Sequence, residues 1–257
     1  MPNNRYFIEF SYDGSSYHGF QKQLNAITIQ EILENAISTI LRDKIDIISA
    51  GRTDSGVHAV NMFAHFNYDI KTKIEESNFC HLLNRILPAD IVINAIHMVK
   101  SDSHSRFDAI SRTYNYYITD TKDPFNHRYR YYLSEELDYS KMNKASKLLY
   151  EYEDFKCFSK SNTDVKTFNC KITNANWIKS DDDWKFTITS NRFLRNMVRA
   201  IVGTLIEIGK GKVEIKDLDR IIQSKDRRNA GDSVPAEGLF LNEIIYDKEI
   251  FIKSWKK

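Results

Sequence analysis

The chain has 257 residues, of which 42% are hydrophobic and 28% charged, so it can form one large or two small domains with a substantial core. It contains no run of about 18 apolar residues, which excludes a membrane-spanning helix, and its first ten residues lack the layout of a signal peptide. The three cysteines are widely spaced and form no CxxC pair. This argues against a disulfide framework or a zinc site and favours a cytoplasmic protein.

The first part of the chain alternates between strand and helix patterns. Residues 5–12 are rich in aromatic and β-branched side chains, as in a strand. Thr28 and Glu31 have capping-box spacing at the start of a helical apolar stripe that extends to Leu41. We expect further strands at 44–49, 61–68 and 90–99, a loop at 50–59, and a second helix over 74–87 that stops before Pro88.

The second part repeats this order. It predicts strands at 112–119, 171–179, 184–191 and 238–246 and helices at 140–152 and 193–209. Strand, helix, strand, strand, helix, strand is the split βαβ pattern of ferredoxin-like folds. We therefore expect an α+β fold in which two ferredoxin-like halves, residues 1–104 and 105–257, join into an extended, mostly antiparallel sheet with a central cleft. The loop at 50–59 belongs to the first half and would point into that cleft.

Positive charge is concentrated in one segment, although the net charge of the chain is only +2. Residues 184–228 contain eleven Lys and Arg against five Asp and Glu, a net charge of +6. Such a segment suits a phosphate-binding face on a nearly neutral protein. A solvated helical surface would explain the same charges, so charge alone leaves both interpretations open.

The sequence AGRTDSGVHA at 50–59 places an acid, Asp54, between Gly51 and Gly56, which let a backbone turn sharply or approach a ligand closely. A carboxylate there could be a nucleophile, a metal ligand or a turn-forming group. A metal site needs several converging ligands, and only His58 lies nearby. A phosphate-binding loop is disfavoured because the acid would repel phosphate and a strand-like segment follows. The nucleophile and turn interpretations both remain.

Arg52, two residues before Asp54, favours a role beside nucleic acid. A guanidinium can hold phosphate or fill the space left by an extruded base. An enzyme that acts on a base must take that base out of the stack. A space-filling side chain and a reactive group therefore belong close together.

Five ordered blocks between residues 8 and 241 resemble the tRNA pseudouridine synthase A family. Besides AGRTDSGVHA, these blocks are EFSYDGSSYHGFQKQ with TIQEILENAI, HSRFDAISRTYNYYI, NRFLRNMVRAIVGTLIEIG and AEGLFL. The resemblance implies an isomerase that converts uridine to pseudouridine at positions 38 to 40 of tRNA, in the anticodon stem-loop. It also implies that the enzyme uses no metal or organic cofactor and acts as a homodimer.

The same resemblance implies roles for individual side chains. Asp54 matches the family's catalytic acid, which attacks a carbon or removes a ribose proton. Arg199 matches the Met-Val-Arg position, and its implied partner is Asp54 in a salt bridge. Tyr114, the first tyrosine of an Arg-x-Tyr-x-Tyr block, is implied to stack on uracil and to serve in proton transfer. Arg195 and Arg199 fall at the edge of the predicted helix's apolar stripe, from which an arginine can reach a cleft or solvent.

RNA docking is expected at two places. His18, Phe20 and Gln21 lie where the family loop approaches tRNA. The basic segment supplies phosphate partners, which are Arg192, Arg195, Lys210, Lys212, Arg227 and Arg228. Cys170 stands where the family commonly has arginine, and Ser55 replaces a frequent alanine. Both departures concern individual tRNA contacts and leave the acid in place.

Other functions are weighed against this one. The substrate could be another RNA or other uridines, or the chain could be a tRNA-binding module without catalysis. Loss of the acid at position 54 would indicate such a module, and the acid is present. A metal-dependent nuclease needs a carboxylate cluster that the sequence lacks.

Overall fold

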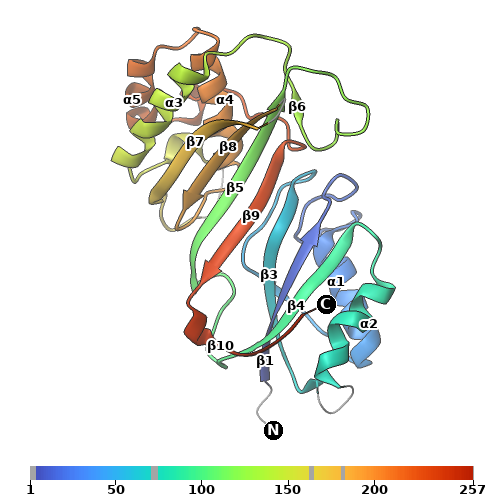
Figure 1. Cartoon of the computed structure of the whole chain (residues 1–257). Coiled ribbons are helices and arrows are strands. Elements are labelled where there is room, and N and C mark those ends of the chain that lie inside the picture. The colour runs from blue at the N-terminus through green and yellow to red at the C-terminus, as the bar shows by residue number, and fades with distance from the viewer. Residues whose placement is uncertain (1–3, 71–74, 162–164, 181–182, 257) are drawn as a thin grey trace. The chain divides into compact units, whose positions relative to one another are not determined.

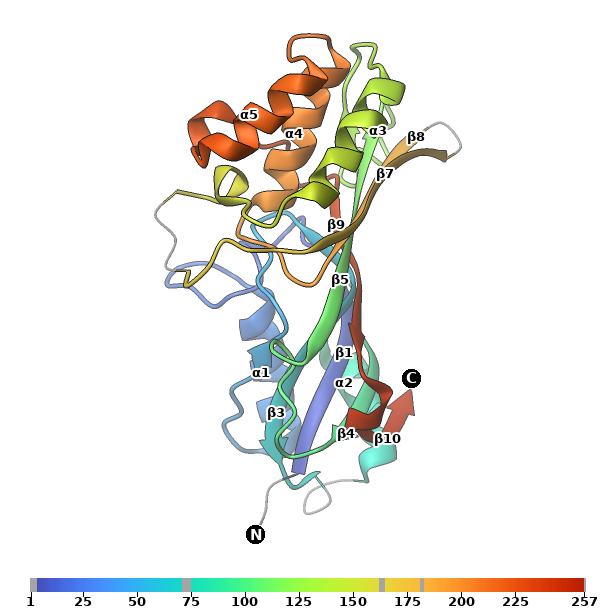
Figure 2. The same ribbon diagram turned by 90° about the vertical axis from the view of Figure 1, so that its left-hand side faces the viewer.

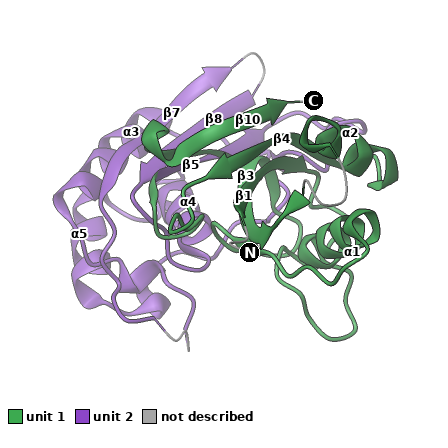
Figure 3. Ribbon diagram, turned by 90° about the horizontal axis from the view of Figure 1, so that it is seen from below, with its two compact units in different colours: residues 1–110, 241–257 green, residues 111–240 purple. Residues whose placement is uncertain are grey.

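The computed structural model describes residues 4–70, 75–161, 165–180 and 183–256. These residues form a mixed α/β structure with ten strands, most of them paired antiparallel (Figure 1). The chain divides into two compact units. Unit 1 comprises residues 1–110 and 241–257, and unit 2 comprises residues 111–240 (Figure 3). None of the helices in the described ranges is long and apolar enough to cross a membrane.

Unit 1 is built on antiparallel strands in the order β10-β4-β1-β3, and β2 pairs with β3 as well. Its strands are β1 Asn4–Tyr12, β2 Ile48–Ser49, β3 His58–Tyr68, β4 Ile91–Val99 and β10 Phe251–Lys256. Its helices are α1 Ile29–Leu41 and α2 Glu76–Ile86. Strand β9, Leu239–Tyr246, crosses the unit boundary after residue 240. Beyond it, the Ile244 amide donates to Asn61 Oδ1 on β3 at 3.3 Å.

Helix α1 begins where its capping pattern predicts. The Thr28 hydroxyl accepts a hydrogen bond from the Glu31 amide at 3.4 Å, which satisfies one of the amides that a helix start leaves without a partner. Leu33 and Ile37 on its apolar stripe are completely buried. The helix ends at Arg42, whose φ of 54° is left-handed and stops further α-helical hydrogen bonding.

Alternation along β1 gives the unit 1 sheet two different faces. Tyr6 turns toward α2, where its hydroxyl donates to Glu76 Oε1 at 2.7 Å. Phe7 turns to the opposite face and contacts Tyr246 and Phe251 edge to face, at centroid distances of 5.3 and 6.3 Å. Both aromatic rings are completely buried, so the sheet contributes core on both faces.

Unit 2 contains the antiparallel order β5-β8-β7, with β6 paired in parallel to β5. Its strands are β5 Ala109–Thr119, β6 Tyr131–Tyr132, β7 Ile172–Ser180 and β8 Asp183–Ser190. Its helices are α3 Tyr139–Leu148, α4 Met197–Gly209 and α5 Ile215–Ser224. Helix α3 packs against both α4 and α5 (Figures 1 and 2). Most of α4 is buried, as expected for a helix that is hydrophobic all round.

Short 3₁₀ helices complete the described structure. They are Leu149–Glu151, Lys156–Phe158, Arg227–Asn229 and Lys248–Ile250. The first of them continues α3, so the helix predicted over 140–152 is present as an α-helix followed by a tighter final turn.

Two expected elements differ from the structure. The strand predicted at 44–49 is reduced to Ile48–Ser49. The helix predicted from residue 193 starts only at Met197, because Asn196 has a φ of 68° and a left-handed backbone cannot continue a right-handed helix. Arg195 therefore lies before α4 and not on its stripe, which corrects the placement made from the apolar pattern.

Three elements have no counterpart in the sequence expectation, namely α5, β6 and β10. Strand β10 matters most for the division of the chain. It pairs antiparallel with β4, with Trp255 opposite Ile96, and so places residues 241–257 in unit 1. The expected halves at 1–104 and 105–257 follow chain order, whereas the compact units follow this non-local pairing.

Candidate active site

The loop between β2 and β3 carries Asp54 in unit 1. The Val57 amide donates to the Asp54 carbonyl at 3.2 Å and closes a tight turn. Gly56 in this turn has a φ of 78°, a conformation that favours glycine. A Cβ atom at Gly51 would meet no atom of the described residues within 4 Å, so Gly51 serves no close approach to another part of the chain. Asp54 is half-buried, so part of the residue is accessible to solvent.

Hydrogen bonds hold the loop on both sides of Asp54. Before it, the hydroxyls of Thr53 and Tyr12 lie 2.8 Å apart, and the Phe20 amide donates to the Thr53 carbonyl at 3.2 Å. After it, the Ser55 hydroxyl donates to the Tyr17 carbonyl at 3.1 Å. Residues 12–20 therefore form a clamp, which we call the 12–20 clamp, that fixes the backbone from which the carboxylate projects.

Two glycines of the 12–20 clamp permit this close approach. A Cβ atom at Gly14 would lie 2.0 Å from the Val57 carbonyl oxygen. A Cβ atom at Gly19 would lie 2.7 Å from the Thr53 carbonyl oxygen, and the φ of Gly19 is 87°. The sequence predicted that Gly51 and Gly56 allow a sharp turn or the close approach of a ligand, and it gave no such role to Gly14 or Gly19. Their place in the SYDGSSYHGF segment was a signal, but it could not indicate which backbone they face.

His58 supports the same clamp from the start of β3. Its buried Nδ1 atom lies 3.1 Å from the Gly14 amide nitrogen and 3.0 Å from Asp13 Oδ1. A neutral ring can accept from Gly14 through Nδ1, whereas a protonated ring would donate to Asp13 instead. In either state the imidazole ties residues 13–14 to the end of the Asp54 loop. Within the described ranges, no group of three or more His, Cys, Asp or Glu side chains is arranged to hold a metal ion.

The predicted RNA-contacting residues of this region separate into exposed and buried ones. His18, Gln21 and Arg52 are exposed. Phe20 is only 1% exposed, and its ring lies against Phe10 at a centroid distance of 6.1 Å. The Phe20 ring is therefore part of the core and offers almost no surface for the RNA contact predicted at this position, while its backbone amide serves the clamp.

Tyr114 lies on β5 in unit 2, opposite Ile188 of β8. Its ring is half-buried and meets Phe193 edge to face at a centroid distance of 5.1 Å. Tyr116 on the same strand is completely buried, and its hydroxyl donates to the Pro235 carbonyl at 2.8 Å. Burial, together with nearby Glu237, raises the pKa of Tyr116. Of these two tyrosines, Tyr114 is the one with surface available to a ligand.

Arg199 lies in the first turn of α4 and is half-buried. Its Nε atom donates to the Val234 carbonyl at 2.7 Å, and the Val234 amide donates back to the Arg199 carbonyl at 3.3 Å. The side chain is thus tied to a second segment of unit 2 and does not simply extend into solvent. Arg195 is exposed, and Arg192 is half-buried with Nη1 3.4 Å from the Thr167 carbonyl oxygen.

The remaining predicted phosphate partners have protein partners of their own. Lys210 forms an ion pair with Glu135, which raises the pKa of the lysine, and Lys212 lies 3.6 Å from Glu207. The Arg228 guanidinium binds Asp226 at 2.6 Å and lowers the pKa of that carboxyl group to about 2. Arg227 donates to oxygens of residues 230–233. The positive charge of this segment is therefore partly neutralised locally.

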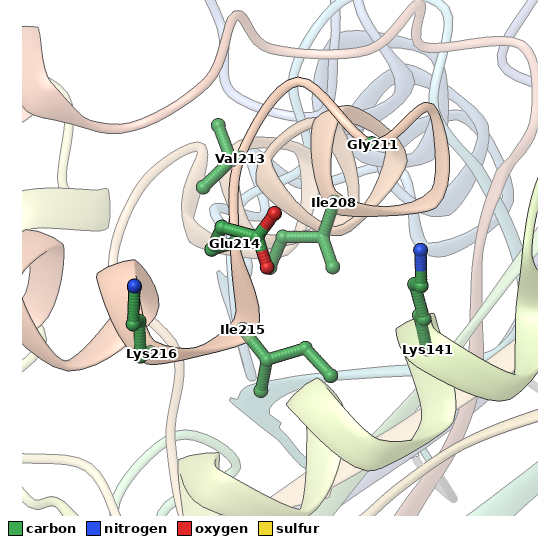
Figure 4. Close-up of a pocket in the computed structure, with 7 residues that line it drawn as sticks. All are labelled: Lys141, Ile208, Gly211, Val213, Glu214, Ile215 and Lys216. Carbon is green, nitrogen blue, oxygen red and sulfur yellow. The ribbon is translucent and has the colours of Figure 1, made fainter.

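A cavity of about 140 Å³ lies in unit 2 between the end of α4, the start of α5 and Lys141 of α3. Figure 4 shows the side chains of Lys141 and Lys216 on opposite sides of it, with the Glu214 carboxylate between them. None of the residues predicted for the active site lines this cavity. We therefore do not assign the reaction to it.

A family model described as tRNA pseudouridine synthase matches residues 9–108 and 145–247. The chain therefore belongs to the tRNA pseudouridine synthase family. Asp54 falls in the first matched segment and Arg199 in the second, whereas Tyr114 lies between them.

Individual relatives match over nearly the whole chain and carry the name tRNA pseudouridine synthase A. The Bacteroides fragilis protein is 51% identical over 252 residues, which cover 98% of this chain and 100% of the relative. The Porphyromonas gingivalis protein is 49% identical, covering 96% and 99%. The Staphylococcus aureus protein is 35% identical, covering 98% and 95%. The family resemblance inferred from five sequence blocks is confirmed.

Proposed function

We propose that this chain isomerises uridine to pseudouridine in tRNA, with Asp54 as its reactive carboxylate. The observation that supports this most directly is the half-buried Asp54, whose two neighbours in sequence are each bonded to the 12–20 clamp. A turn-forming aspartate would not need a backbone fixed from a separate segment. A reactive carboxylate does, because an error of about 1 Å in position can cost about 100-fold in rate.

The reaction rearranges one nucleoside and needs no external oxidant or reductant. The bond from uracil N1 to ribose C1′ breaks, the base turns, and a bond forms between C5 and C1′. The hydrogen on C5 leaves as a proton, and N1 gains one. Asp54 would act in its ionised form, either by attacking a carbon or by removing a ribose proton.

Arg199 and Tyr114, both in unit 2, are the further residues that we propose for the reaction. An arginine beside Asp54 would favour the ionised carboxylate against the cost of desolvation. Tyr114 would stack on the extruded uracil, and its hydroxyl would carry a proton. The half-burial of both side chains supports these roles, since each is anchored in the protein yet retains exposed surface. Arg52 would fill the space that the base leaves.

The substrate we propose is the anticodon stem-loop of tRNA, at positions 38 to 40. Docking would use the exposed side chains of His18, Gln21, Arg52 and Arg195, together with the half-buried Arg192. Phosphate contacts would position the RNA without selecting uridine. We further propose that the protein is a cytoplasmic homodimer and that each chain is built from two split βαβ halves. The orders β4-β1-β3 and β5-β8-β7 support the strand arrangement of those halves.

Release of tritium from 5-tritiated uridine in an anticodon stem-loop tests this function. The unmodified chain should release tritium, and Asp54→Ala and Asp54→Asn should not. The exposed Asp102 offers a matched control, and Asp102→Ala should retain full release. Tritium release by Asp54→Ala at the normal rate would reject Asp54. Binding of the stem-loop without any release by the unmodified chain would favour a tRNA-binding module.

A further inference from the structure

The Arg227 guanidinium forms its hydrogen bonds within the protein. It lies half-buried in the short 3₁₀ helix that follows α5. Its Nη1 atom lies 3.3 Å from the Ala230 carbonyl oxygen and 2.9 Å from that of Gly231, and its Nη2 atom lies 2.9 Å from Ser233 Oγ. One side chain therefore holds three positions of the segment that follows it.

That segment, residues 230–234, is packed directly on α4. The Gly231 amide donates to the Thr204 hydroxyl at 2.9 Å. A Cβ atom at Gly203 would lie 1.8 Å from the Asp232 carbonyl oxygen, so the helix and the segment are in backbone contact. At the start of α4, Asn196 Nδ2 donates to Ser233 Oγ at 2.6 Å.

The segment ends at the residue that orients Arg199. Val234 follows Ser233 directly, and its carbonyl oxygen accepts from Arg199 Nε at 2.7 Å. Arg227 thus holds Ser233, and the next residue, Val234, carries the carbonyl oxygen that fixes the Arg199 side chain. Both arginines belong to unit 2, so this connection lies within one compact unit.

The neighbouring Arg228, in the same 3₁₀ helix, faces solvent and so provides a comparison for Arg227. Its side chain is 88% exposed and binds Asp226 of its own turn. Arg227 instead donates to carbonyl and hydroxyl oxygens of a segment that follows it, which a surface phosphate contact does not require. These intramolecular bonds favour a structural role for Arg227 over the predicted contact with phosphate.

We propose that Arg227 is a positioning residue for uridine isomerisation, holding residues 230–234 so that the Val234 carbonyl keeps the Arg199 guanidinium in its working orientation. The inference rests on the proposed function, in which Arg199 acts at the reaction centre. Lysine cannot replace Arg227 fully, because a single ammonium group lacks the planar fork that reaches several fixed oxygens at once.

Steady-state kinetics and a double substitution test the proposal. Arg227→Ala should lower kcat by about tenfold or more, because it misplaces a side chain at the reaction centre. Arg227→Lys should fall between Arg227→Ala and the unmodified chain. The Kd for tRNA and its dependence on salt should stay unchanged. Arg199→Ala combined with Arg227→Ala should be no slower than Arg199→Ala alone, since both act through one guanidinium.

Arg220 provides the matched control. It is an exposed arginine of α5, with its guanidinium 3.1 Å from Asp217, and Arg220→Ala should keep normal kcat. If Arg227→Ala does not fold, Ser233→Ala offers a milder change, because it removes the oxygen that both Arg227 and Asn196 contact. Ser233→Ala should then lower kcat in the same direction and should add nothing to Arg199→Ala.

Hydrogen exchange at Arg199 Nε gives a readout that does not depend on activity. The bond to Val234 should slow this exchange in the unmodified chain, and Arg227→Ala should speed it while the main-chain amides of α4 keep their protection. Unchanged exchange together with unchanged kcat would overturn the proposal. A raised Kd with a salt slope lower by about one would overturn it in favour of a phosphate contact.

The two proposals fail in different ways. If Arg199→Ala keeps normal turnover, the proposed role of Arg199 at the reaction centre fails. If Arg199→Ala loses turnover but Arg227→Ala does not, only the positioning role of Arg227 fails.

Discussion

The hydroxyl groups of Tyr12 and Thr53 lie 2.8 Å apart in the interior of unit 1, one residue before Asp54. Tyr12 ends β1 and Thr53 lies in the loop that precedes β3, so the bond joins the sheet to the residue directly before the candidate reactive residue. Together with the Phe20 and Ser55 contacts, it makes the position of Asp54 a property of the 12–20 clamp as well as of its own loop.

Tyr12→Phe should therefore reduce both stability and turnover. The change leaves the buried Thr53 hydroxyl without this partner, which we expect to lower the free energy of unfolding by about 1–3 kcal/mol. It also loosens the backbone at Asp54, so kcat should fall while the Kd for tRNA stays nearly constant. Urea denaturation and tritium release measure the two effects. Tyr132→Phe, on the partly exposed strand β6, is the control and should leave both unchanged.

Gly14→Ala should destabilise unit 1, whereas Gly51→Ala should be tolerated. The new methyl group at position 14 would meet the Val57 carbonyl oxygen at 2.0 Å, while that at position 51 would meet nothing within 4 Å. We expect a loss of about 1–3 kcal/mol for Gly14→Ala, the usual cost of overpacking. Thermal denaturation of the two variants measures this difference, and Gly14→Ala should have the lower melting temperature. Equal melting temperatures would contradict the close approach described for the 12–20 clamp.

Tyr114→Phe should separate the two proposed jobs of this tyrosine. The phenylalanine ring can keep the edge-to-face contact with Phe193, so folding stability and tRNA binding should change little. Loss of the hydroxyl should lower kcat by about 10²–10⁴-fold if it transfers a proton. Tyr114→Ala should weaken binding as well. Normal kcat in Tyr114→Phe would leave the ring with a stacking role alone.

His65 should make unit 1 sensitive to acid. The side chain is 3% exposed, and its Nδ1 atom accepts from the Ser105 amide at 3.3 Å and lies 2.8 Å from the Ser105 hydroxyl. Burial, reinforced by the positive charge of nearby His104 and Arg5 and opposed by Asp108, lowers the pKa of His65 to about 4. The folded protein therefore binds fewer protons at this site than the unfolded chain does between pH 4 and 6.5.

The contribution of neutral His65 to the free energy of unfolding is fully present above pH 6.5 and is lost as the pH falls toward 4. For a pKa shift of this size the loss is on the order of 3 kcal/mol. His65→Gln should show a smaller fall in the free energy of unfolding between pH 7 and pH 4.5 than the unmodified chain. His127→Gln, at an exposed position, should show the same fall as the unmodified chain. Identical pH profiles for His65→Gln and the unmodified chain would refute this assignment.

Several features of the molecule could be predicted from local sequence. The Thr28 cap, the strand at 5–12 and the buried stripe of α1 follow from patterns within a few turns of chain, and the structure confirms them. The GRTDSGVH motif and four further blocks were sufficient to indicate the family, which the comparisons confirm. Each of these depends on residues that are near one another in sequence.

Only the tertiary structure decided the features that depend on distant partners. Phe20 is buried because it meets Phe10 and the backbone of Thr53, and Gly14 is needed because Val57 lies against it. Strand β10 joins unit 1 because β4 offers it an edge more than 150 residues earlier in the chain. Arg227, by contrast, resembles any surface arginine in sequence. Its partners are close along the chain, but the packing of residues 230–234 on α4 determines what it holds.

The physical reason is the range of the interactions. Helix caps and hydrophobic periods arise from backbone bonds and burial patterns that repeat every few residues, so the sequence by itself determines them. Close backbone approaches, the start of α4 at Met197 after the left-handed Asn196, and the orientation of Arg199 depend on which segments meet after folding. Sequence therefore determined the residues available for chemistry, and tertiary packing decided which of them keep exposed surface and which are bonded into the fold.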